Sequence, residues 1–145
     1  MTNIEQLQQG YAQITDIDVK WGEMDAFQHI NNVAYIRYLE DARLALFAKL
    51  GMLSDLTDSN KGPILASISC DYLAPVTYPD RIHVATNVKQ TGAKKMSLEQ
   101  VIYSEKLNRL TTKASSLIIY YDFTNQTSCA VSETVSQAIK ELNED

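Results

Sequence analysis

Apolar and polar positions follow two different periods along the chain, and the first is helical. Five apolar residues recur at steps of four, three, four and four, which places them on one face of an α-helix. They are Tyr35, Leu39, Ala42, Leu46 and Leu50. Asn31 or Asn32 supplies the N-cap and Gly51 the C′ position, so both ends of this helix are marked. Its other faces are also rich in apolar residues, and we expect other structure to wrap it.

The second period is that of β-strands. From Ile64 to Leu73 the even positions are apolar and most odd ones polar, as in a half-buried strand. Similar patterns predict strands over residues 11–20, 82–88, 95–104 and 112–123. A polar loop is expected over residues 52–62, and a short terminal helix over residues 132–143. The first ten residues are polar and predict a flexible tail or a short amphipathic turn.

The order of these elements predicts the fold class. A strand, a loop and a long apolar helix come first, and about four strands with short connections follow. This order indicates an α+β fold in which one long helix is buried against a curved antiparallel sheet of about five strands. There is no internal repeat and no linker, so we expect a single domain over residues 1–145.

Composition narrows the class of protein. The chain has 145 residues, 45% of them hydrophobic, and a formal net charge of −5, which disfavours nucleic acid and anionic membranes as partners. No leader or apolar run of about 18 residues predicts secretion or membrane insertion. Cys70 and Cys129 lack the spacing of a metal or redox site, so we expect no metal, two free thiols and a cytoplasmic protein.

The charge is unevenly distributed. Between Arg81 and Lys113 the chain carries seven basic side chains and only two acidic ones, Glu99 and Glu105, and the rest of the chain is strongly acidic. A basic segment of this kind is either a solvated face or a surface for an anionic ligand.

The segment before the long helix is dense in groups that can do chemistry. It reads Glu23-Met24-Asp25-Ala26-Phe27-Gln28-His29-Ile30-Asn31-Asn32 and has no regular period, which predicts an ordered loop. A carboxylate at Asp25 can lie near the positive end of the helix, where its ionised form is favoured. Backbone N–H groups around Asn32 have no acceptor within the helix and can hold a carbonyl oxygen on which negative charge develops.

This segment resembles the signature of hot-dog-fold thioesterases of the 4-hydroxybenzoyl-CoA thioesterase family. The resemblance rests on Trp21-Gly22-Glu23-Met24-Asp25, on Gln28-His29-Ile30-Asn31-Asn32, and on Tyr35 with the helical Glu40 and Arg43. The resemblance also includes the strand from Ile68 to Leu73 with Pro75 and Asp80, and the order of elements matches over about residues 11–123. The resemblance implies that Asp25 is the catalytic aspartate, either as nucleophile or as general base, and that the Asn32 amide is the oxyanion donor.

Two readings of His29 stay open. Its spacing of four from Asp25 resembles the Asp/Asn/His set of plant acyl-carrier-protein thioesterases, which implies a catalytic or water-orienting histidine. The asparagine of that set is replaced here by Phe27, and the alternative is a histidine that hydrogen-bonds the loop into shape. Phe27 and Tyr35 are expected to line the acyl pocket.

The resemblance also gives a candidate coenzyme site. Lys94 and Lys95 follow the turn at Gly92, where family members often carry basic residues that hold the phosphates of coenzyme A. The alternative is an exposed hairpin tip. Coenzyme A is then part of the substrate, and no separate cofactor is expected.

Other chemical groups are expected to be structural. We interpret Glu23 as an exposed loop carboxylate, Glu40 and Arg43 as an ion pair on the helix, and Cys70 as a buried thiol. His83 lies on the polar face of its strand and is expected to be exposed.

The sequence therefore predicts an acyl thioesterase that hydrolyses an acyl-CoA or acyl-carrier-protein thioester. Family active sites form between two subunits, which implies a homodimer or a tetramer of dimers. The alternatives are a non-catalytic acyl-CoA-binding module and an enoyl-CoA hydratase. The hydratase spacing Asp-x-Asn-x-x-His is absent, and the DNA-binding segment of sensor versions has no room in this length.

Overall fold

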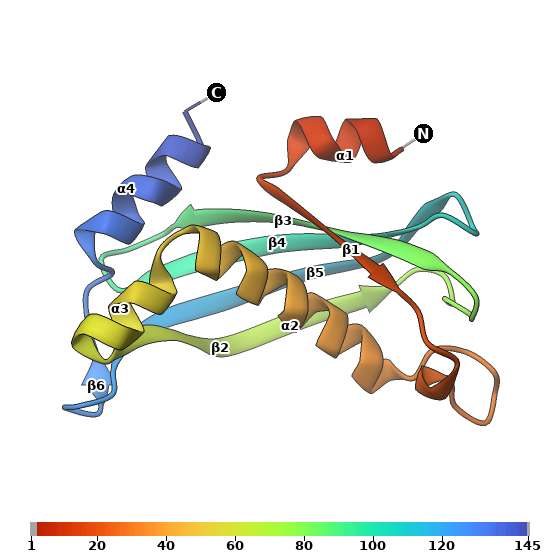
Figure 1. Cartoon of the computed structure of the whole chain (residues 1–145), viewed down its shortest axis with the longest axis horizontal. Helices are drawn as coiled ribbons and strands as arrows, with labels where there is room; N and C mark the ends of the chain where they lie inside the picture. Colours follow the sequence, from red (N-terminus) through yellow and green to blue (C-terminus); the bar gives the residue numbers. More distant parts are fainter. Residues whose placement is uncertain (1–2, 145) are drawn as a thin grey trace.

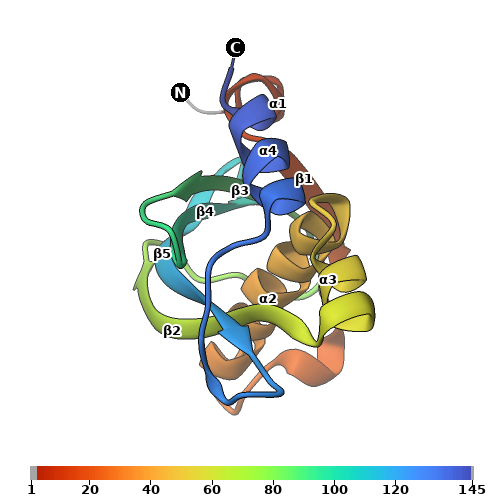
Figure 2. The ribbon, with the colours of Figure 1, turned by 90° about the vertical axis from the view of Figure 1, so that its left-hand side faces the viewer.

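The computed structural model describes residues 3–144 as an antiparallel sheet curled around one long helix (Figure 1 and Figure 2). In chain order the elements are α1 (Ile4–Gly10), β1 (Gln13–Asp18), η1 (Trp21–Glu23), α2 (Asn32–Lys49), α3 (Met52–Ser59), β2 (Lys61–Tyr72), β3 (Arg81–Gln90), β4 (Lys95–Ser104), β5 (Arg109–Asp122), β6 (Thr127–Ser128) and α4 (Glu133–Leu142). None of these helices is long and apolar enough to span a membrane.

The sheet has the strand order β1-β3-β4-β5-β2, and the two-residue β6 pairs with the end of β5. All pairs are antiparallel, so β3, β4 and β5 form consecutive hairpins. The strands β1 and β2 are the two edges. Seen from the end in Figure 2, the strands form an arc beside α2. The predicted α+β class and the five main strands are confirmed.

The helix α2 is the predicted long helix, and its predicted apolar face is buried. Leu39, Ala42 and Leu46 are completely buried against the sheet. Asn31 caps the helix, because its Oδ1 accepts a hydrogen bond from the Val33 N–H at 2.8 Å. Within one chain the wrapping is one-sided, since Leu44 on the far side of the helix is 55% exposed.

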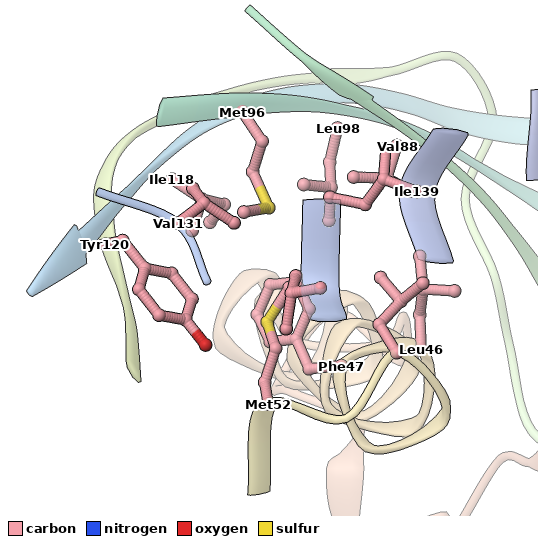
Figure 3. Close-up of a cluster of buried hydrophobic side chains, with 12 residues drawn as sticks. Leu46, Phe47, Met52, Val88, Met96, Leu98, Ile118, Tyr120, Val131 and Ile139 are labelled. Atoms are coloured by element: carbon pink, nitrogen blue, oxygen red, sulfur yellow. The ribbon is translucent and has the colours of Figure 1, made fainter. Parts of the chain in front are cut away.

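The larger core cluster lies between the C-terminal half of α2, the sheet and α4, as Figure 3 shows. Leu46 and Phe47 of α2 face Met96 and Leu98 of β4, and Ile139 of α4 covers the same space. Full burial of one such side chain contributes about 1.5–3 kcal/mol, so this cluster fixes α2 on the sheet.

The expectation of a flexible tail over the first ten residues is wrong for residues 4–10, which form α1. Asn3 and Gln6 make a capping box, and Leu7 is only 3% exposed. Leu7 packs with Ala85 and Tyr103 on the sheet face away from α2. One apolar contact with distant strands orders a segment whose own pattern is polar. Residues 1 and 2 lie outside the described residues.

The polar loop expected over residues 52–62 is also wrong, because residues 52–59 form α3. Only Met52 of this helix is buried, so burial of its own side chains contributes little to its stability. Tertiary hydrogen bonds hold it instead: the Asp55 carboxylate accepts from the hydroxyl of Tyr120 on β5 and, at 2.7 Å, from that of Ser132, the N-cap of α4.

The predicted alternation in β2 holds over only part of the strand. The register with β5 shifts between Leu65 and Ser67, which is a β-bulge. Beyond the bulge Ile68 and Cys70 pack against the core, whereas Ile64 before it is 36% exposed. The bulge changes which side chains point inward, because the side-chain period of a strand is two residues.

Candidate active site

The loop before α2 is folded into a tight hairpin. Met24 and Ile30 form an antiparallel bridge, the Asp25 N–H donates to the His29 carbonyl at 2.9 Å, and the Gln28 N–H donates to the Asp25 carbonyl at 3.0 Å. Gln28 closes the turn in the left-handed region at φ +64°. The Ile30 N–H donates to the Val76 carbonyl, which ties the hairpin to the segment between β2 and β3.

Asp25 presents its carboxylate at the exposed base of this hairpin. Its Oδ1 accepts the Phe27 N–H at 2.9 Å. Within residues 3–144, no hydrogen bond reaches Oδ2. One carboxylate oxygen therefore fixes the orientation of the side chain, and the other is free for a proton or an acyl group.

Asn32 is the first residue of α2, one position after the cap that the structure assigns to Asn31. In the described part of the chain its backbone N–H has no acceptor. Such a donor at a helix N-terminus favours a partial negative charge beside it. Its position is therefore that required of the predicted oxyanion donor.

A pocket of about 540 Å³ joins these groups. It is lined by Asp25, His29, Ile30, Asn32, Tyr35, Tyr72, Leu73, Ala74 and Pro75. The structure thus brings together four of the seven residues predicted for the site, namely Asp25, His29, Asn32 and Tyr35. A mostly apolar wall with a few polar groups at one end is the usual form of a small-molecule site.

Two tyrosines make the aromatic wall of the pocket. Tyr35 is 5% exposed, and its hydroxyl accepts the Val76 N–H at 2.8 Å. The ring of Tyr72 stands edge-on to it, with centroids 5.0 Å apart and an interplanar angle of 79°. The Tyr72 hydroxyl donates to Asn32 Oδ1. Burial, and then the neighbouring Cys70 thiol, raise the pKa of Tyr72 to about 12, so it is a neutral donor.

Sequence reasoning placed Tyr72 only on the apolar face of a strand and missed it as a pocket residue. Its separation from Asn32 is forty residues, and no local pattern signals that the end of β2 meets the start of α2. The family resemblance includes the strand from Ile68 to Leu73 and Pro75, but it gives Tyr72 no role in the site.

Phe27, Lys94 and Lys95 do not line this pocket. Phe27 lies at the tip of the hairpin and is 82% exposed. Lys95 of β4 pairs with Ile119 of β5, and Ile119 pairs with Ile64 of β2. Lys95 and Ile64 therefore lie at the same height along the sheet. Tyr72 is eight residues further along β2, about 25 Å at the usual rise per residue. Figure 1 shows the turn between β3 and β4 at the end of the sheet opposite the loop before α2.

Glu23 is not the exposed loop carboxylate that was expected. It is half-buried, and its Oε1 accepts hydrogen bonds from the Lys20 N–H at 2.8 Å and from the Tyr38 hydroxyl at 2.6 Å. Burial and this carboxylate raise the pKa of Tyr38. Glu23 thus holds the loop against α2, and the carboxylate left for chemistry is Asp25.

The expected pair between Glu40 and Arg43 is also not formed. Glu40 instead faces Arg37 at 3.9 Å on the exposed side of α2. Arg43 is 6% exposed, and burial lowers the pKa of its guanidinium. No ion pair or hydrogen bond joins Arg43 to any residue that the structure describes.

His83 is buried, contrary to expectation. It is 6% exposed because β1 places Asp16 directly opposite it and the turn after β4 places Glu105 on its other side.

Cys70 is half-buried, as a structural thiol would be, and burial raises its pKa. A raised pKa disfavours the reactive thiolate.

The family profile of the thioesterase-like superfamily matches residues 19–139, a span that contains the hairpin, α2 and the pocket. This match covers most of the chain. The chain belongs to the thioesterase-like superfamily. This is a family of acyl-CoA thioesterases with the hot-dog fold, so the predicted family, fold and enzyme class are confirmed.

Individual relatives agree with this assignment. Over 128 residues the thioesterase is 23% identical to long-chain acyl-CoA thioesterase FadM of Escherichia coli K12, a match that covers 88% of this chain and 97% of FadM. The PA2801 protein of Pseudomonas aeruginosa is 28% identical with a TM-score of 0.79, covering 89% of this chain and 98% of that one. The SAV2348 protein of Staphylococcus aureus, solved in complex with CoA, has the same fold at 15% identity, with a TM-score of 0.83 and coverage of 89% and 82%.

Proposed function

We propose that this protein hydrolyses an acyl-CoA thioester to a free acid and coenzyme A at the pocket beside the start of α2. The observation that carries the proposal is the meeting of a free carboxylate oxygen of Asp25 and a free N–H of Asn32 in one mostly apolar pocket. The relative FadM, named as a long-chain acyl-CoA thioesterase, supports an acyl-CoA substrate.

In the proposed reaction the Asn32 N–H holds the thioester oxygen while negative charge develops on it. As general base, Asp25 takes a proton from water, the water oxygen attacks the carbonyl carbon, the C–S bond breaks and the thiolate is protonated as it leaves. As nucleophile, Asp25 itself attacks, the thiolate leaves, and water hydrolyses the resulting anhydride. Both routes use the ionised carboxylate of Asp25.

His29 supplies a further polar side chain to the pocket wall. Only its backbone carbonyl is used in the hairpin, by the Asp25 N–H. We propose that its ring orients the water or the leaving group, which explains why a histidine is placed beside Asp25 rather than an apolar residue.

We further propose a homodimer formed through β2. This strand is an edge of the sheet, twelve residues long, and exposes Ile64, Leu65 and Tyr72. Unprotected apolar edges are sites of strand pairing, and two-fold symmetry is the commonest way for identical chains to pair.

Such pairing would bring the predicted coenzyme site to the pocket. If two β2 strands run antiparallel about their midpoints, the Lys61 end of one lies beside the Tyr72 end of the other. Lys94 and Lys95 of the partner subunit would then lie about 15 Å across the joined sheet from Tyr72, three strand spacings away. This explains how lysines distant from Asp25 in one chain can hold the phosphates of the same substrate. With Cys70 and Cys129 both free thiols, we keep the cytoplasm as the expected compartment.

The substitution Asp25→Asn tests the proposed function. We expect it to lower kcat for thiol release across an acyl-CoA chain-length and aryl-acyl panel by at least about 10³-fold, because the amide can neither attack nor accept a proton. Thermal unfolding should stay unchanged, since Asn keeps the oxygen that accepts the Phe27 N–H.

Three results would contradict the proposed function. Full activity of Asp25→Asn would exclude the mechanism. Wild-type protein that binds acyl-CoA without releasing thiol would favour the binding module, and loss of the enoyl absorbance of crotonyl-CoA would favour the hydratase. Asp41→Asn on the exposed side of α2 serves as a control for the charge change.

A further inference from the structure

The Tyr72 hydroxyl makes a contact that the proposed reaction does not yet use. It donates to the side-chain oxygen Oδ1 of Asn32 at the rim of the pocket, although Tyr72 ends β2 and Asn32 starts α2. Tyr72 is 47% exposed, so burial of its ring alone does not explain its position.

The Tyr72 ring is held on its other side by Tyr35. The edge-on contact between the two rings sets the direction of Tyr72, and the hydrogen bond from the Val76 N–H fixes Tyr35 in turn. Contacts of this kind between aromatic rings contribute about 0.5–1.5 kcal/mol. The Tyr72 hydroxyl is therefore a fixed donor and not a freely rotating surface group.

The contact decides which way the Asn32 amide points. A side-chain amide has one acceptor oxygen and one NH₂ group, and the Tyr72 hydroxyl donates to the oxygen. The Nδ2 group is then turned away from Tyr72. No acceptor for Nδ2 exists among the residues that the structure describes. Asn32 lines the pocket, and its backbone N–H and its Nδ2 group are both left without an acceptor in the described part of the chain.

We propose that Tyr72 is a positioning residue that orients the Asn32 side chain, so that Nδ2 joins the Asn32 backbone N–H in holding the thioester oxygen during hydrolysis. This inference rests on the proposed function. It makes the oxyanion site a two-donor site built on one residue and oriented by a side chain at the end of β2. Preorganised donors are effective because they need not reorient as charge develops.

A double-mutant cycle tests the role of Tyr72. Asn32→Ala keeps the backbone N–H and removes Nδ2, and should lower kcat about 10²-fold with little change in KM. Tyr72→Phe keeps the ring against Tyr35 and removes only the hydroxyl, and should lower kcat about 10-fold or more, again with KM nearly unchanged. Because Tyr72 acts through Asn32, Tyr72→Phe should have no further effect in the Asn32→Ala background.

Tyr78→Phe is the matched control, since Tyr78 is 44% exposed in the segment after β2 and does not line the pocket. It should keep wild-type kcat and KM. A side-chain amide NMR signal of Asn32 that is ordered in the wild type and averaged in Tyr72→Phe would support the positioning contact without turnover.

Three outcomes would overturn the proposal. The first is full kcat in Tyr72→Phe, and the second is an effect of Tyr72→Phe on KM alone. The third is that Tyr72→Phe lowers kcat by the same factor in the wild type and in the Asn32→Ala background. The last would mean that Tyr72 acts on the substrate directly. Absence of turnover by the wild type on every acyl-CoA would instead overturn the proposed function itself, so the two failures are distinguishable.

Discussion

At the scale of single residues, charged side chains surround the buried His83. Its Nδ1 lies 2.5 Å from Asp16 Oδ1 and its Nε2 lies 2.6 Å from Glu105 Oε2. Arg81 adds contacts to Asp16 at 3.4 Å and to Glu105 at 3.8 Å. These contacts join the edge strand β1 to β3 and to the turn after β4, and β1 leads directly into the active-site loop.

This cluster predicts how stability depends on pH. Burial by itself raises the pKa of the Asp16 carboxyl, but the hydrogen bonds and charges of His83 and Arg81 outweigh it, and the net pKa lies below the ordinary value of 3.8. Ionised Asp16 therefore stabilises the fold above pH 3.8, and this contribution is lost as the pH falls through the lower pKa of the folded state.

We expect Asp16→Asn to lower Tm at neutral pH by about 2 °C, since a half-exposed pair contributes at most about 1 kcal/mol. The variant should also lose less of its Tm than the wild type between about pH 5 and pH 2. Thermal unfolding followed by circular dichroism measures both effects. Asp18→Asn is the control, because Asp18 is 76% exposed and contacts Arg81 but not His83. Parallel acid limbs for Asp16→Asn and wild type would show that Asp16 contributes nothing.

At the scale of elements, the short helices at the two ends of the chain close the sheet on its two faces. In Figure 1 both helices lie above β3, but they cover opposite faces of the sheet. The helix α1 packs through Leu7 on the face away from α2, whereas α4 packs through Val135 and Ile139 into the core beside α2. Each depends on strands far away in sequence for its stability.

The packing of α1 gives a direct test. We expect Leu7→Ala to lower the free energy of unfolding by about 2–3 kcal/mol, because it leaves a cavity beside Ala85 and Tyr103. Gln8→Ala, an exposed position of the same helix, should change it by less than about 0.5 kcal/mol. Urea titration gives both values. Equal stability of Leu7→Ala and wild type would mean that α1 is not docked in solution.

At the scale of the whole molecule, the pocket and the lysines of one chain lie at opposite ends of the sheet. The proposed two-fold pairing of β2 is what would bring Asp25 of one subunit and Lys94 and Lys95 of the other to one substrate. A site shared in this way has a characteristic consequence for mixtures of variants.

Mixing Asp25→Asn subunits with subunits that carry Lys94→Glu and Lys95→Glu should restore activity. After subunit exchange about half of the dimers contain one subunit of each variant. In such a dimer one of the two sites combines an intact Asp25 with intact lysines of the partner subunit. About a quarter of wild-type activity is therefore expected. The lysine variant alone should show a raised KM for acyl-CoA that depends less on salt than the wild-type value. No recovery in the mixture would place the lysines and Asp25 in separate sites or in one chain.

The sequence by itself determined the features that rest on local periodicity and local chemistry. The face of α2 from Tyr35 to Leu50 follows from the helical period, and the cap at Asn31 and the left-handed Gly51 follow from the conformational preferences of those residues. The strands and the α+β class follow from alternation and short connections. Asp25, His29 and Asn32 could be expected to lie together because all are within eight consecutive residues beside one helix N-terminus, and they line one pocket.

Only the tertiary structure decided the features that depend on contacts between distant segments. Tyr72 donates a hydrogen bond to Asn32, and Glu23 accepts one from Tyr38 instead of lying exposed. His83 is buried, and residues 4–10 form the helix α1. None of these features is signalled by a local sequence pattern. The β-bulge after Leu65 likewise reverses part of a strand that alternation alone describes as uniform. The physical reason is that burial and hydrogen-bond partners are set by the packed chain, whereas periodicity reports only which face of an element is apolar.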